Sequence, residues 1–275
     1  MQRKSYVKWI FVSLAAILII SAITFRIYQK WYSHFASIRN SKQYYISGIY
    51  QTGPQKDAVS SIKLAELMKL SVDSPTHILD FDESQAEKNL LAYPLFKKVN
   101  VKKWKPASIF VDYTIRDPYL IVEDYEDVVM DKDGVLFPYS QFFSTKRLPK
   151  CYLGANENFD LNEKKKLTLR CFQKAQSFFE GSAFKIESLD VSDAFSDSFA
   201  KREIIFKISQ EFEEQIFPYY LRMSVVEIEK QLSNFLVLNK EFSKQQKLWL
   251  KLYPNVSPKE KVVDLRIEGM ALIDN

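Results

Sequence analysis

Seventeen consecutive residues without a charged side chain, from Trp9 to Phe25, set the N-terminal part of this chain apart from all that follows. As an α-helix this run would rise roughly 26 Å, at the short end of what crosses a lipid bilayer. The alternative is a cleaved signal peptide, whose apolar region is shorter and ends at a small-x-small site. The nearest approach to such a site, ISA at 20–22, lies inside the run. We therefore expect an uncleaved transmembrane helix over residues 9–25, with the lipid bilayer as a partner, after a short tail over residues 1–8.

The charges around this run do not decide its orientation, because basic residues stand on both sides of it. Three precede the run and four follow it: Arg3, Lys4 and Lys8, then Arg26, Lys30, Arg39 and Lys42. Apolar and aromatic residues recur at helical spacing over residues 26–43. That pattern fits a helix leaving the membrane and fits equally an aromatic-rich linker without fixed structure.

The composition is that of a folded protein, since 47% hydrophobic and 27% charged residues exclude a disordered chain. Arg3, Lys4 and Lys8 account for three of the 39 basic residues, so the remainder carries 36 against 34 acidic ones. This near balance argues against nucleic acid as a partner. Cys151 and Cys171 either pair in an oxidising compartment or stay free, with Cys171 in the core.

From residue 44 to residue 116 the pattern indicates strand, helix, helix, strand and strand. The segment SSIKLAELMKL places Ile62, Ala65 and Met68 three residues apart, as on one face of a helix. Ser60 or Ser61 precedes them in the position of an N-cap.

The second helix and the two strands complete this unit. DESQAEKNLLAY begins near Asp82 and ends before Pro94, because the residue before a proline resists helical geometry. FKKVNVKKW and SIFVDYTI then alternate apolar and polar residues, as half-buried strands do. We expect an α+β unit in which two helices cover a small sheet, with Leu90 on the buried face of the second helix.

Residues 117–275 indicate a second α+β unit with an extended sheet. DKDG within VVMDKDGVLF predicts a hairpin turn between Val128 and Phe137. A calcium loop is excluded there, because Val129 and Ser140 occupy its first and twelfth positions.

Two helices and a strand follow. We expect a helix from about Asn162 to Phe179, with one apolar face made by Leu167, Cys171, Ala175 and Phe178. The segment EIIFKIS alternates as a strand, with Ile204, Phe206 and Ile208 on one side. SVVEIEKQLSNFL opens with Ser224 and Glu227 at the spacing of a capping box. The terminal strands would complete the sheet.

The sequence offers no set of catalytic groups. His34 and His77 are the two histidines, and we expect His77 in a solvated loop. Ser5 with Lys8, and Ser60 with Lys63, match Ser-x-x-Lys, but the further motifs of serine acyltransferases are missing. We therefore expect a protein that is not an enzyme, with no cofactor, no metal and no small-molecule substrate.

The run YPLFKKVNVKKWKPASIFVDYTIRDPYLIV resembles the POTRA segment of the bacterial cell-division family of FtsQ and DivIB. In that family a helix ends at Pro, a basic strand reaches an aromatic-x-Pro turn, and an apolar strand runs into Arg-x-Pro. The matching residues are Pro94, Val99, Val101, Trp104, Pro106, Ile109, Val111, Arg116 and Pro118. VVMDKDGVLF and VVDLRIEGMALI resemble the family's hairpin and its closing Asp-Leu-Arg motif. This chain departs from the family at Ile115, where a Glu is frequent.

The resemblance implies a non-catalytic bitopic scaffold of the division machinery, which links early and late division proteins. It implies a single pass through the cytoplasmic membrane, with the N-terminus inside. A POTRA domain over residues 44–116 and a C-terminal β domain over 117–275 would lie outside. FtsB and FtsL are the implied partners, with septal peptidoglycan synthases nearby. The alternative is a POTRA-bearing component of protein transport or envelope assembly. An anchored cell-wall enzyme is disfavoured by the missing catalytic groups.

The last residues, VVDLRIEGMALIDN, predict the partner-binding site. We expect a strand over Val262–Ile267, a turn at Glu268 and Gly269, and a last strand over Met270–Ile273 at the sheet edge. FtsQ-like proteins are expected to receive a strand of FtsB along this edge. The candidate contact residues are Ile267, Gly269, Met270, Ala271, Leu272 and Ile273. The alternative is a short edge with no partner.

Other residues near this edge and in the turns have an expected structural role. Asp264, Arg266, Pro94, Pro106 and Pro118 are predicted to stabilise the fold rather than to touch a partner. Some relatives carry aromatic residues near the last turn, where this chain has Ile267 and Ile273. We therefore expect the side chains that anchor the partner to differ from those in such relatives.

Overall fold

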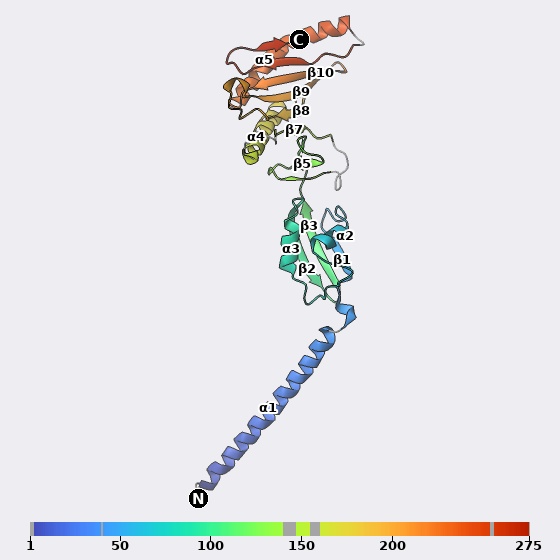
Figure 1. Cartoon of the computed structure of the whole chain (residues 1–275), viewed down its shortest axis with the longest axis vertical. Helices are drawn as coiled ribbons and strands as arrows, with labels where there is room; N and C mark the ends of the chain where they lie inside the picture. Colours follow the sequence, from blue (N-terminus) through green and yellow to red (C-terminus); the bar gives the residue numbers. More distant parts are fainter. Residues whose placement is uncertain (1–2, 40, 140–146, 155–159, 254–255, 275) are drawn as a thin grey trace. The chain divides into compact units, whose positions relative to one another are not determined.

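The computed structural model describes residues 3–39, 41–139, 147–154, 160–253 and 256–274, with side chains from Ile17 onward. The chain divides into two compact units, Met1–Ile115 and Arg116–Asn275. Each contains helices and a sheet of its own, so the fold class is α+β (Figure 1).

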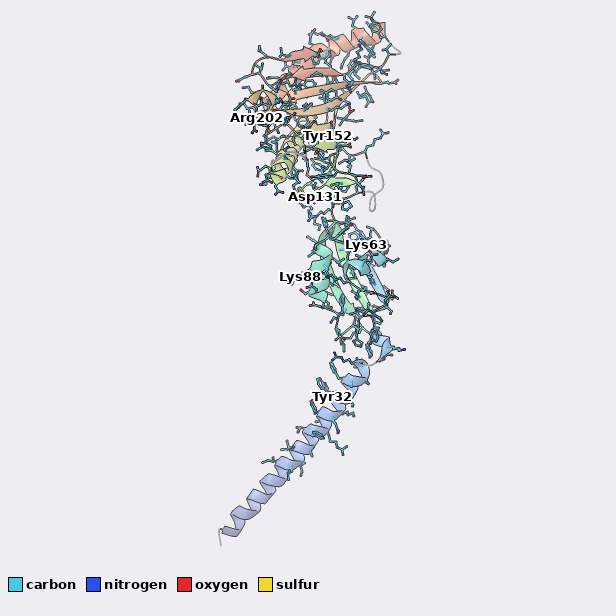
Figure 2. All side chains as sticks on the ribbon, in the orientation of Figure 1. Tyr32, Lys63, Lys88, Asp131, Tyr152 and Arg202 are labelled. Carbon is cyan, nitrogen blue, oxygen red and sulfur yellow. The ribbon has the colours of Figure 1, made fainter. Side chains whose placement is uncertain are left out.

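The first element is the long helix α1, Arg3–Arg39. In the part of the chain that the structure describes, no helix combines the length and the apolar character needed to cross a membrane. The prediction of a transmembrane helix over residues 9–25 is therefore wrong. Exposed aromatic residues such as Tyr32 project from this helix (Figure 2).

The rest of the first unit has the expected order of strand, helix, helix, strand and strand. The elements are β1 Gly48–Thr52, α2 Ser61–Leu67, α3 Glu83–Leu91, β2 Phe96–Trp104 and β3 Ser108–Ile115, after a 3₁₀ turn at Lys42–Tyr44. The sheet order is β1-β3-β2, with β1 parallel and β2 antiparallel to β3. Helix α2 packs against β1, and α3 packs against β2.

Side-chain caps start both helices of this unit. The Ser60 hydroxyl accepts a hydrogen bond from the Lys63 amide at 3.2 Å, and the Asp82 carboxylate accepts one from the Gln85 amide at 3.1 Å. Each cap satisfies an amide that has no partner within the helix. The Ser60–Lys63 spacing is thus explained by helix capping.

The buried face of α2 differs from the prediction. Leu64 and Met68 are buried, whereas Ile62 is 75% exposed. Leu64 and Met68 are four residues apart and share one face, which places Ile62 on the opposite side of this short helix.

His77 is buried, so the prediction of a solvated loop histidine is wrong. Its Nε2 lies 3.3 Å from the carbonyl oxygen of Ile38, and its Nδ1 accepts a hydrogen bond from the Leu79 amide at 3.2 Å. Tyr45 forms an isolated bridge with it. The ring therefore serves as a structural link in this unit.

The second unit is built on one sheet of order β12-β11-β10-β9-β8-β7-β4-β5-β6. The strands are β4 Leu120–Val122, β5 Val128–Met130, β6 Leu136–Pro138, β7 Lys150–Tyr152, β8 Phe184–Asp190, β9 Ile204–Phe212, β10 Gln215–Met223, β11 Lys261–Asp264 and β12 Leu272–Asp274. Three neighbouring pairs are parallel, namely β4 with β7, β7 with β8, and β10 with β11. The sheet is therefore mixed.

Two helices, α4 Leu161–Phe179 and α5 Ile228–Leu252, cover one face of this sheet and close the core. On β9, Ile204, Phe206 and Ile208 are fully buried, as the alternating pattern predicts. On α4, Phe179 is buried and Phe178 only partly so, which corrects the predicted face by one residue.

The start of α5 also differs from the prediction. Glu227 has a positive φ of 52° and makes no side-chain cap, so the expected capping box is absent from this helix start. Instead, the amide group of the Gln231 side chain bonds to Ser224, accepting from its backbone N–H at 2.9 Å. A side chain from within the helix has replaced the local cap.

The predicted hairpin between Val128 and Phe137 is confirmed. Asp131 organises the turn, because its Oδ1 accepts from the amides of Asp133 and Val135, each at 2.9 Å. Its Oδ2 accepts from Arg116 at 2.8 Å.

Both cysteines are free and buried, Cys151 on β7 and Cys171 on α4. Burial raises the pKa of the Cys151 thiol to about 12 and that of Cys171 to about 11. Neither thiol is therefore activated as a nucleophile.

Candidate partner-binding edge

The last two strands, β11 and β12, form one edge of the large sheet. β11 runs parallel to β10, and the Leu265 amide extends this pairing by donating to the Arg222 carbonyl at 2.8 Å. Val263 and Leu265 are buried in the core. β12 then pairs antiparallel with β11, with Ile273 opposite Val263. The candidate edge strand β12 thus pairs with β11, a strand that is packed into the core.

A cluster of four charged side chains anchors β11 to its neighbours. Arg266 makes paired hydrogen bonds to Asp264, from Nε at 3.0 Å and from a terminal nitrogen at 2.7 Å. Glu203 receives Arg266 at 3.1 Å and Arg222 at 2.8 Å. This cluster joins the segment before β9, strand β10 and the end of β11. Bidentate contacts between arginine and carboxylate are among the stronger ionic hydrogen bonds.

The cluster also shifts the pKa values of Asp264 and Arg266. Burial alone would raise the pKa of Asp264, but the hydrogen bonds and charges of Arg266 and Arg222 prevail and hold that pKa below its ordinary value. The hydrogen bond to Asp264 likewise raises the pKa of Arg266. Asp264 and Arg266 therefore act within the fold, and the sequence could not reveal Glu203 and Arg222 as their partners.

The turn before β12 lies at Glu268 and Gly269, where the sequence predicts it. Gly269 has a φ of 72°, a conformation that a residue with a Cβ rarely adopts, and the Met270 amide donates to the Ile267 carbonyl at 3.2 Å. Glu268 forms an ion pair with Lys230 of α5. That contact lowers the pKa of Glu268 and ties the turn to the helix.

The two strands are shorter than predicted. β11 ends at Asp264 rather than at Ile267, because the Asp264 carboxylate accepts the Arg266 amide at 3.1 Å and diverts the backbone. β12 covers Leu272–Asp274 rather than Met270–Ile273. Ala271 lies just before it and packs against the core.

The apolar side chains of this edge face solvent. Four of the six candidate contact residues are large and exposed: Ile267, Met270, Leu272 and Ile273. Among the described residues, no hydrogen bond reaches the outer edge of β12 from a side chain or from another backbone segment. An exposed strand with unpaired backbone groups and apolar side chains is the surface that strand addition uses.

The chain protects other edges of its sheets differently. At the far edge of the large sheet, β6 ends in Pro138, which has no N–H to offer. In the small sheet, Glu87 accepts the Val101 amide of edge strand β2 at 2.8 Å, and Glu83 accepts the Lys103 amide at 2.5 Å. Carboxylates from α3 thus occupy that edge, whereas β12 has no comparable protection among the described residues.

The predicted structural prolines lie away from the candidate edge. Pro94 connects α3 to β2, and Pro106 lies in the turn between β2 and β3, both exposed. Pro118 is half-buried just before β4. They end or connect elements in both units and do not contribute to the edge.

Searches of protein-family models and of curated proteins find no match to this chain. The candidate site therefore rests on its geometry and on the motifs in the sequence.

Proposed function

We propose that this chain is a non-catalytic scaffold of the bacterial cell-division machinery that holds a partner by strand addition at β12. The observation that carries the proposal is the open edge of β12, where Leu272 and Ile273 are exposed on a strand that pairs with β11, and β11 is anchored by the partly buried charge cluster. Main-chain hydrogen bonds would supply affinity, and the exposed side chains would supply specificity.

The expected partner is a division protein resembling FtsB, whose extended segment would pair with β12. A protein resembling FtsL and the septal peptidoglycan synthases would join the same assembly. The proposal places the two folded units outside the cytoplasm. It is supported by the succession of motifs that resembles the FtsQ and DivIB family and by the strand–helix–helix–strand–strand order of the small unit.

Replacing Leu272 by Lys tests the partner-binding edge. Leu272 is 58% exposed, so the variant should fold normally, while a lysine on an edge strand opposes pairing with another strand. We expect co-purification of the FtsB-like protein to fall at least about tenfold, as for loss of a central apolar contact.

The matched control is Val237→Lys on α5, which introduces the same charge at a side chain that is 67% exposed. It should leave complex formation unchanged. Equal recovery of the partner with both variants would rule out strand addition at β12. Depletion of the protein should block septation while growth continues, whereas loss of outer-membrane proteins would favour a transport role.

A further inference from the structure

A cavity of about 440 Å³ lies in the second unit, between the C-terminal half of α5, strand β10 and the start of β11. Its volume falls in the range of sites that hold small ligands. Aromatic rings form much of its wall: Phe217 and Tyr219 come from β10, and Phe242 and Trp249 come from α5. Phe217 meets Trp249 edge-on at 5.9 Å, and Tyr219 stacks with Phe242 at 5.9 Å.

The cavity also has a buried polar group. Gln246 lines it, is 4% exposed and donates through Nε2 to the Tyr219 hydroxyl at 2.6 Å and to Gln210 at 3.0 Å. Its Oε1 has no hydrogen-bond partner among the described residues. Gln246 therefore adds a polar side chain to a cavity wall that is otherwise largely aromatic.

Lys261, the first residue of β11, brings a positive charge to the same wall. Its Nζ lies 4.4 Å from the centre of the Phe242 ring and 3.3 Å from Gln245 Oε1. Both contacts are neutral, and no carboxylate of the described residues forms an ion pair with it. The neighbouring Glu260 is engaged by Lys207 at 3.0 Å.

The surroundings of Lys261 therefore favour an anion. Burial lowers the pKa of this lysine, which shows that its ammonium group is partly removed from water without a compensating charge. A ligand carboxylate would supply that charge, while an aromatic body would fill the space between the rings.

We propose that this cavity binds a molecule with an aromatic ring and one carboxylate, the ring lying among Phe217, Phe242 and Trp249 and the carboxylate on Lys261. A free aromatic acid and the C-terminal residue of a peptide share this chemistry. The site is separate from strand addition at β12 and does not depend on it.

Calorimetric titration of the full chain with indole-3-propionate, and with the neutral indole-3-propionamide, tests the charge requirement. The two probes share ring and length, so only the ionic contact differs. We expect the acid to bind at least about tenfold more tightly, as for a hydrogen bond to a charged group. Equal affinities, or no binding of either probe at millimolar concentrations, would overturn the proposal.

Two variants assign the contact to Lys261. Lys261→Gln should reduce the affinity for the acid to that for the amide, whereas Lys247→Gln, at an exposed lysine of α5 that does not line the cavity, should leave it unchanged. An unaltered preference for the acid in a folded Lys261→Gln protein would refute the assignment. If Lys261→Gln does not fold, the comparison of the two probes on the unmodified protein still decides the proposal.

The same titration distinguishes the two sources of ligand. The tripeptide Gly-Gly-Trp carries the ring and a terminal carboxylate on a peptide backbone. Tighter binding of this peptide than of indole-3-propionate would identify a peptide C-terminus as the occupant. Tighter binding of the free acid would identify a small molecule. In both cases the neutral amide of the preferred probe, indole-3-propionamide or Gly-Gly-Trp amide, should bind more weakly than the probe with its free carboxylate.

Discussion

Replacing Leu90 by Asp is expected to unfold the sheet of the first unit while the second unit stays folded. Leu90 on α3 is fully buried, so an aspartate there would place an unpaired charge in the core. Such a change costs more than about 4 kcal/mol, which is a large part of the stability of a small unit. Hydrogen exchange of the full chain should show lost protection in β2 and β3 and normal protection in β9 and β10.

Leu91→Asp is the matched control, since the same residue type is changed one position along the helix. Leu91 is 46% exposed, and its replacement should alter stability by roughly 0.5 kcal/mol or less. Protection of β2 and β3 should then match that of the unmodified protein. Similar exchange in the Leu90 and Leu91 variants would show that α3 does not pack on the sheet through Leu90.

Replacing Asp264 by Asn is expected to destabilise the second unit by about 2 kcal/mol, because it removes a charged partner from Arg266 and Arg222 in a poorly exposed cluster. Chemical denaturation of the full chain, followed through the second unit, measures the change. Asp274→Asn on the exposed edge strand is the control and should have little effect. If Asp264→Asn is as stable as the control, the charge cluster does not stabilise β11.

The same residue predicts a pH dependence. The pKa of Asp264 in the folded protein lies below its ordinary value of 3.8, so its carboxylate stabilises the fold above that value. This contribution is lost as the pH falls from about 3.8 through the lower folded pKa. The difference in stability between the unmodified protein and Asp264→Asn should therefore shrink over that acid range. A difference that stays constant there would contradict the assigned ionisation.

Local patterns in the sequence determined most of the secondary structure. Ser60 and Asp82 begin helices because a side-chain oxygen can reach an amide two or three residues ahead, a contact that needs no distant partner. Alternation identified β9, because neighbouring side chains on a strand point to opposite faces. Gly269 marked the last turn for an equally local reason, its freedom to adopt a positive φ.

For the candidate edge, the sequence indicated where the chain turns and which side chains could be exposed. The position of β12 at the edge of the sheet depends on which strands pair. β11 pairs with β10 although the whole of α5 separates the two strands in the sequence. Asp264 and Arg266 were visible as a motif, whereas their contacts with Glu203 and Arg222 come from segments distant in sequence. The end of β11, in contrast, is set by a local contact, the hydrogen bond from the Arg266 amide to the Asp264 carboxylate.

Only the tertiary structure decided the features that depend on groups meeting across the fold. His77 is buried because α1 and the Tyr45 segment pack on it, and Gln231 replaces the predicted cap of α5. Glu83 and Glu87 reach the edge of β2 because the packing of α3 sets their distance from that strand. The cavity beside Lys261 joins residues from 217 to 261. Burial and charge pairing act between groups close in space, and periodicity along a single chain carries no record of them.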